Sequence, residues 1–160
     1  MIEVERKVRV GEDGRISLPK MSKILVVLRN DVDYAKTVDY VVNLASSMVD
    51  PKIQILYTVD VEPVPSHEET ERKFYRKLRK EGEEIVKNAI SKIKDAGIDV
   101  ELHDMHFGIA AERILKAEKE LNPDLIVMGA RGLSTFKKML LGSISDEVTR
   151  KAKAPVLIVR

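Results

Sequence analysis

Short apolar runs alternate with longer amphipathic stretches along most of the chain, from about residue 23 to the end. Five of these runs have the length and aliphatic composition of strands. They are residues 24–28, 53–59, 99–103, 124–128 and 155–159. The run at 99–103 alternates polar and apolar residues, so one of its faces should be less buried. Because longer stretches separate the runs, the pattern predicts βαβ units and a parallel sheet.

The intervening stretches place apolar residues three and four positions apart, which is the period of an amphipathic helix. The predicted helices span residues 34–48, 70–96, 111–121 and 143–153. Pro51, Gly97 and Pro123 follow the first three helices as stop signals. Ser143 and Asp146 have the spacing of a capping box at the start of the last one. With right-handed crossovers, the predicted fold class is α/β, a doubly wound five-stranded parallel sheet.

The first residues lie outside this rhythm. The segments RKVRV and RISLP flank GEDG, a pattern that predicts a β-hairpin with a Gly/Asp turn. A two-stranded ribbon is marginally stable alone, so we expect it to pack on the domain or on a partner chain. The predicted organisation is therefore a hairpin arm at residues 1–21 and a single α/β domain at residues 22–160.

Composition and charge exclude several classes of function. The 28 Lys and Arg residues nearly balance 26 Asp and Glu, which argues against a polyanion-binding surface over the whole molecule. Without cysteine, the chain has no disulfide, thiolate metal site or cysteine nucleophile. The start MIEVERKVRV lacks the apolar core of a signal peptide, and no segment approaches a membrane span of about 18 apolar residues. We therefore expect a cytoplasmic protein.

The most informative stretch is GARGLSTFKKMLLGSIS, from Gly129 to Ser145, between the fourth predicted strand and the last predicted helix. In open α/β sheets ligands bind beyond the carboxyl ends of the strands, where Gly129 lies. Gly129 and Gly132 lack β-carbons, so the backbone there can approach a phosphate or a sugar closely. Gly142 and Ser143 open a helix whose free N–H groups favour an anion. The serine hydroxyls could add phosphate hydrogen bonds.

This stretch matches neither of two common nucleotide motifs, because it contains no GK[ST] and no G-x-G-x-x-G. Its spacing, G-x-x-G, nine residues and then G-S, closely resembles the nucleotide-binding signature of the ATP-binding branch of the universal stress protein (UspA-like) family. The resemblance runs from about Ser22 to Arg160 and includes KILVVL, DLIVMGARG and APVLIVR. It implies an adenine nucleotide alpha hydrolase-like fold, a stress-response regulator or sensor, and a homodimer paired through the final strand.

The resemblance also assigns ligand contacts by position. Adenine and ribose would lie near the ends of the first, second and fourth strands, at Val27, Leu28, Arg29, Thr58 and Met128. Phosphates would lie on Gly129, Gly132, Gly142, Ser143, Ile144 and Ser145, with Arg131 between two of the glycines as a further contact. The expected ligand is ATP or an AMP-type nucleotide. Mg²⁺ would arrive with the phosphates and not be held by a protein cage.

Arg29 departs from the family pattern, which usually has an aspartate just after the first strand that helps to hold the nucleoside. Asp31 and Asp33 lie close enough in sequence to substitute for it. Arg29 could equally reach a phosphate through a charge-assisted hydrogen bond. The alternative function is a dimeric interaction module of the same fold that has lost nucleotide binding.

Catalytic and metal-binding roles are not assigned. No general base or assembled nucleophile is recognisable near the glycine loop, so any ATP hydrolysis is expected to be slow. His103 and His106, with Asp104 between them, lack an identifiable third ligand and are interpreted as solvated or loop residues.

Nucleic acid is not an expected partner. The segment VRVGEDGRISLP resembles half of an AbrB-type swapped-hairpin module, a kind that dimerises and binds DNA. The acidic Glu12 and Asp13 would face the phosphate backbone unfavourably. The pattern therefore favours an arm that packs on the domain or extends a dimer.

Overall fold

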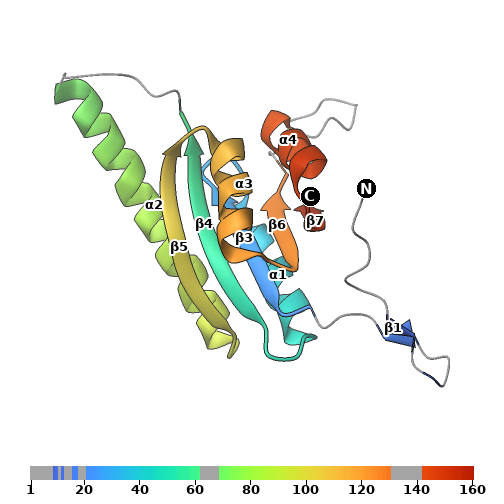
Figure 1. Ribbon diagram of the computed structural model, residues 1–160. Helices are drawn as coiled ribbons and strands as arrows, with labels where there is room; N and C mark the ends of the chain where they lie inside the picture. The colour runs from blue at the N-terminus through green and yellow to red at the C-terminus, as the bar shows by residue number, and fades with distance from the viewer. Residues whose placement is uncertain (1–8, 11, 13–15, 18–20, 62–68, 131–141) are drawn as a thin grey trace.

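The structure is a computed structural model that describes residues 9–10, 12, 16–17, 21–61, 69–130 and 142–160 (Figure 1). Near the amino terminus, β1 (Arg9–Val10) and β2 (Ile16–Ser17) pair antiparallel, as predicted for a hairpin. Five further strands form a parallel sheet in the order β5-β4-β3-β6-β7. The predicted fold class is thereby confirmed.

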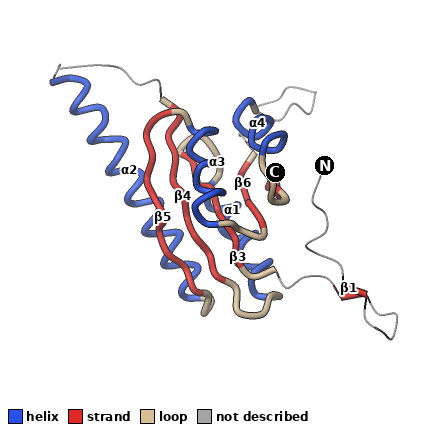
Figure 2. The backbone as a smooth tube through the Cα atoms, in the orientation of Figure 1, coloured by secondary structure: helices blue, strands red, loops and turns tan. Residues whose placement is uncertain are grey.

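The strands and helices of this sheet domain alternate strictly along the chain, as Figure 2 shows. They are β3 (Lys23–Arg29), α1 (Tyr34–Ser46), β4 (Lys52–Asp60), α2 (Glu69–Asp95), β5 (Asp99–Gly108), α3 (Ala110–Leu121), β6 (Leu125–Gly129), α4 (Ser143–Lys151) and β7 (Val156–Val159). None of the helices within the described ranges is long and apolar enough to cross a membrane.

The core has two layers, one on each face of the sheet. Ile24, Val26 and Leu28 of β3 belong to the layer formed with α1 and α2. Leu25 and Val27 belong to the layer formed with α3 and α4. Side chains alternate between the two faces along a strand. The face of each residue at the end of a strand therefore follows from the core layer to which the preceding residues belong.

Strand β5 is longer than the sequence pattern predicted. The strand was expected to end at His103, but it continues to Gly108 and pairs with β4 through a register irregularity. Met105 and Phe107 of this extension pack on the core layer under α1 and α2, so their burial prolongs the strand. His106, expected as a solvated or loop residue, consequently lies in a strand.

Tyr57 is a fully buried residue of β4. Its ring meets Phe107 edge to face, with centroids 6.4 Å apart. Its hydroxyl has no hydrogen-bond partner among the described residues. Burial, reinforced by the charges of Glu81 and Asp31, raises the pKa of Tyr57 to about 12. Tyr57 is therefore neutral in the folded protein at any ordinary pH.

We expect the Tyr57→Phe variant to lose less stability at alkaline pH than the wild-type protein does. An unfolded tyrosine ionises near pH 10 whereas folded Tyr57 holds its proton to about pH 12. The contribution of Tyr57 to the free energy of unfolding is therefore complete below pH 10 and is lost as pH rises through about 12. At pH 11 the wild-type protein should have lost about 1.4 kcal/mol that the variant keeps.

Urea unfolding at pH 8 and pH 11 measures this difference. At pH 8 the variant should be at least as stable as the wild-type protein, because the hydroxyl that it loses has no hydrogen-bond partner in the described part of the chain. Tyr40→Phe is the matched control, since Tyr40 is 49% exposed. An equal alkaline loss in the wild-type protein and the Tyr57 variant would contradict the expectation.

Candidate functional site

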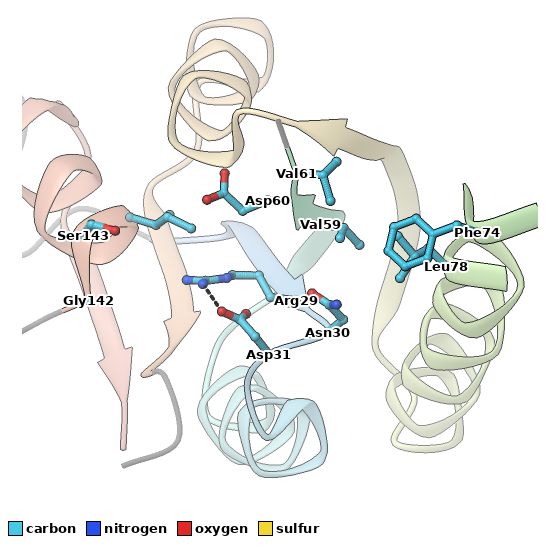
Figure 3. Close-up of a pocket in the computed structure, with 11 residues that line it drawn as sticks. Arg29, Asn30, Asp31, Val59, Asp60, Val61, Phe74, Leu78, Gly142 and Ser143 are labelled. Carbon is cyan, nitrogen blue, oxygen red and sulfur yellow. Dashed lines mark hydrogen bonds and ion pairs between the residues drawn. The ribbon is translucent and has the colours of Figure 1, made fainter. Parts of the chain in front are cut away.

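A cleft of about 240 Å³ opens where β3 and β4 end (Figure 3). Its walls come from the segment after β3, the end of β4, the amino-terminal half of α2 and the start of α4. The lining residues are Arg29, Asn30, Asp31, Val59, Asp60, Val61, Phe74, Leu78, Gly142, Ser143 and Ile144. The cleft therefore lies beyond the carboxyl ends of the strands, where the sequence predicted a ligand.

Arg29 supplies a buried cation to this cleft. It is the last residue of β3 and only 4% exposed. Its Nη2 donates to Oδ2 of Asp31 at 2.5 Å, the dashed line in Figure 3. Of the two carboxylates proposed as substitutes for the family aspartate, Asp31 thus lines the cleft as the partner of Arg29. Asp33 instead caps α1, where its Oδ1 accepts from the Lys36 N–H at 3.1 Å.

The amino terminus of α4 forms the wall beside Arg29. The predicted capping box is wrong, because Gly142 is the N-cap and Ser143 is already the first helical residue. Gly142 has no side-chain oxygen to accept from the helix, and the first helical hydrogen bond runs from the Asp146 N–H to the Gly142 carbonyl at 2.9 Å. The N–H groups of Ser143 to Ser145 precede that bond and have no acceptor within the helix.

At the start of two other helices, a carboxylate of the chain accepts a hydrogen bond from a free N–H group. Asp33 caps α1, and Oδ1 of Asp60 accepts from the Ala110 N–H at the start of α3, at 3.0 Å. No side chain in the described part of the chain caps α4. Uncapped N–H groups at the positive end of a helix are suited to an anion that comes from outside the chain.

The residues predicted to hold adenine and ribose divide between the two faces of the sheet. Val27 and Met128 belong to the core layer under α3 and α4, and strand alternation places Arg29 and Thr58 on that same face. Leu28 belongs to the opposite layer. Apart from Arg29, these residues are fully buried and do not line the cleft. Contact between them and a ligand stays a prediction.

Thr58 differs from the others in being polar. It is fully buried, and its Oγ1 has no hydrogen-bond partner among the described residues. Thr58 pairs in register with Arg29, so it lies directly beside the cation of the cleft. A buried hydroxyl without a partner is energetically unfavourable, and a ligand group that reached it would relieve that cost.

The predicted phosphate contacts are only partly described. Gly142, Ser143 and Ile144 line the cleft, whereas Ser145 is buried in α4. Arg131 and Gly132 lie outside the described residues.

Gly129 has a structural reason to be glycine. A β-carbon there would lie 2.8 Å from Oγ1 of Thr37 and 3.1 Å from Cγ2 of Val32. The close packing of α1 and the segment before it against the end of β6 therefore requires glycine, whether or not a ligand approaches.

Sequence reasoning missed the wall formed by α2 and the end of β4. Phe74 and Leu78 line the cleft together with Val59, Asp60 and Val61. Phe74 is 54% exposed despite its size. Its spacing of four residues from Leu78, within the helix predicted at residues 70–96, is also typical of the buried stripe of a long helix. Periodicity alone cannot distinguish an aromatic residue over the core from one that overhangs the end of a sheet.

Comparison with known proteins covers nearly the whole chain. The sequence model of the universal stress protein family matches residues 21–160. Universal stress protein YxiE of Bacillus subtilis is 33% identical over 150 residues, covering 87% of this chain and 99% of its own length. The solved structure of MJ0577 of Methanocaldococcus jannaschii is similar with a TM-score of 0.74 and 27% identity, covering 88% of this chain and 96% of that one.

A second solved structure is informative about ligands. It is a universal stress protein in complex with cAMP, similar to this chain with a TM-score of 0.60 and 26% identity. The alignment covers 89% of this chain and 98% of that protein.

Proposed function

Because the chain belongs to the universal stress protein family, we propose that its cleft binds an adenine nucleotide, ATP or an AMP-type nucleotide, in a stress-response regulator or sensor. The observation that carries this proposal is the uncapped amino terminus of α4, which opens onto the cleft beside Arg29. The cAMP complex of a structural relative supports an adenine nucleotide as the ligand.

The phosphates would lie between Arg29 and the start of α4. The N–H groups from Ser143 onward offer partial positive charge, and the guanidinium of Arg29 adds a full one. Asp31 and Asp60 also line the cleft, and their carboxylates would repel bare phosphates. Mg²⁺ arriving with the phosphates would offset that repulsion, since carboxylate oxygens suit this ion.

The base would lie against the apolar wall. Val59, Val61 and Leu78 line that side of the cleft, and Phe74 presents an exposed ring (Figure 3). Apolar and aromatic side chains with a few polar groups are typical of sites that bind a flat heterocycle. The cleft therefore offers separate surfaces to the base and to the phosphates.

Calorimetric titration with adenosine, AMP, ADP and Mg-ATP tests this function. The wild-type protein should bind the phosphorylated compounds more tightly than adenosine. In Arg29→Met, which keeps volume but removes the charge, affinity for ATP should fall roughly 10- to 100-fold, as expected for a lost charge-assisted hydrogen bond. Affinity for adenosine should stay nearly unchanged.

The matched control is Arg150→Met, which removes an exposed cation of α4 that does not line the cleft. This variant should bind ATP as the wild-type protein does. Equal ATP affinity in the wild-type protein and Arg29→Met would contradict the phosphate placement. A wild-type protein that binds none of the four compounds would favour the alternative, an interaction module without a nucleotide.

A homodimer paired through β7 is part of the same proposal. β7 lies at the edge of the sheet and pairs with β6 alone among the described strands. Its residues Val156, Leu157 and Ile158 are only half-buried in the single chain. An open edge with apolar side chains favours pairing with a second copy, which light scattering would detect as twice the chain mass.

A further inference from the structure

Asn30 places a polar side chain on the apolar side of the cleft. It directly follows Arg29 at the end of β3 and lines the cleft together with Val59 and Leu78. In Figure 3 the guanidinium of Arg29 extends toward Ser143, whereas the Asn30 amide lies nearer to Leu78. Asn30 is therefore closer to the wall proposed for the base than to the wall proposed for the phosphates.

Folding gives no reason for an asparagine at this position. Asparagine is common in turns because it tolerates a left-handed backbone and because its side chain bonds to the local backbone. In the described part of the chain, the residues other than glycine with a positive φ are Asp50 and Asn122, so the backbone of Asn30 is not left-handed. The Asn30 side chain is exposed and has no hydrogen-bond partner among the described residues. Its amide is therefore available to a ligand.

The charged side chains of the cleft are already engaged. Arg29 donates to Asp31 at 2.5 Å, and Asp60 accepts from the Ala110 N–H at 3.0 Å. A guanidinium only donates hydrogen bonds, and an ionised carboxylate only accepts them. The amide of Asn30 differs, because its carbonyl oxygen accepts while the NH₂ group beside it donates. Such a group suits a ligand edge that carries a donor next to an acceptor.

Adenine has an edge of this kind. Its 6-amino group donates and the neighbouring N7 accepts, a pair that the amide of asparagine can bind with two hydrogen bonds. On the same edge guanine carries two acceptors, O6 and N7, so an amide can satisfy only one of them. The apolar wall cannot make this distinction, because every base has a face that stacks. Selection between the two purines therefore requires a hydrogen-bonding group beside the base.

We propose that Asn30 selects adenine in the cleft, with its carbonyl oxygen accepting from the 6-amino group and its NH₂ group donating to N7. This inference rests on the proposed nucleotide function and adds to it the residue that determines base specificity. Arg29 and Ser143, proposed to hold the phosphates, lie on the other side of Asn30 from Leu78 (Figure 3). Loss of the Asn30 amide should therefore weaken recognition of the base and leave the phosphate contacts in place.

Calorimetric titration of the full chain with three magnesium-bound triphosphates tests the proposal. They are ATP, GTP and purine riboside triphosphate, which lacks the 6-amino group. The wild-type protein should bind ATP roughly 10-fold more tightly than either of the other two, the scale of one or two neutral hydrogen bonds. In Asn30→Leu, which has nearly the same shape without the amide, ATP affinity should fall roughly 10-fold. The three compounds should then bind within about threefold of one another.

The matched control is Asn43→Leu. Asn43 is an exposed residue of α1 that does not line the cleft. This variant should keep the wild-type affinities and the preference for ATP. Both variants should unfold at nearly the wild-type temperature, because neither side chain forms a hydrogen bond within the described part of the chain.

The pattern over the three compounds separates base recognition from a general disturbance of the cleft. Equal weakening of all three in Asn30→Leu would overturn the proposal, and so would a preference for ATP that survives in this variant. GTP or purine riboside triphosphate that binds the wild-type protein as tightly as ATP would also overturn it, while leaving nucleotide binding intact. A wild-type protein that binds none of the three would instead refute the nucleotide function, and the role of Asn30 with it.

Discussion

Replacement of Ser143 by aspartate is expected to abolish nucleotide binding without destabilising the fold. Ser143 is the first residue of α4, where a carboxylate interacts favourably with the helix dipole by about 0.3–1 kcal/mol. The same carboxylate would occupy the position proposed for a phosphate and repel it. At short range and partial exposure this repulsion should lower ATP affinity at least about 100-fold. Calorimetry and thermal unfolding measure the two opposite effects.

Two further variants at this position separate charge from shape. Ser143→Asn has nearly the shape of the aspartate variant without its charge, and it should retain most of the affinity for ATP. Ser143→Ala removes one hydroxyl and should weaken binding by no more than about tenfold, the scale of one neutral hydrogen bond. ATP affinity that survives in Ser143→Asp would show that the phosphates lie elsewhere.

Replacement of Gly82 by alanine is expected to destabilise the protein, although alanine is the better helix former. Gly82 lies inside α2, and an added β-carbon would clash with Cε1 of Tyr57 and lie 2.9 Å from Cε of Met105. Tyr57 is fully buried and cannot move without disturbing the core. The gain in helix propensity of about 1 kcal/mol is smaller than the strain of such overpacking. We expect a net loss of about 2 kcal/mol in unfolding free energy.

A double-mutant cycle identifies the cause of that loss. In a Tyr57→Leu background the ring is absent, so the same Gly82→Ala change should be neutral or slightly stabilising. Urea unfolding of the four proteins gives the coupling. If Gly82→Ala raised stability in the wild-type background, the close packing of Tyr57 on the helix would be disproved.

Much of the fold was predictable because each strand carries its own local pattern. The run at residues 24–28 lies within β3 (Lys23–Arg29), and the predicted helix at residues 70–96 differs from α2 (Glu69–Asp95) by one residue at each end. The extension of β5 was missed because two consecutive polar residues, His103 and Asp104, interrupt the alternation of polar and apolar residues, at the point where the pairing with β4 skips His103. The burial of this extension depends on the neighbouring strand β4 and on α2, which are remote in sequence.

The residues of the candidate site were predictable only where a local sequence signal fixes the position of the backbone. The start of α4 follows from the glycine-serine step, so Gly142, Ser143 and Ile144 were anticipated. The cleft wall at Phe74 depends on where α2 passes the end of the sheet, which no local pattern records. Gly129 shows that the sequence alone does not reveal why a glycine is needed at a position. A glycine that admits a ligand and one that admits a neighbouring helix both lack a β-carbon, so the sequence could not reveal the contact with Thr37.

In the proposed complex, the first N–H groups of α4 bind the phosphates of an adenine nucleotide. Amide ¹⁵N NMR spectra recorded during titration with Mg-ATP and, separately, with adenosine test this contact most directly. ATP is expected to shift the amide signals of Ser143, Ile144 and Ser145 most strongly, while adenosine should leave them nearly unchanged. ATP binding that leaves these three signals in place would contradict this contact.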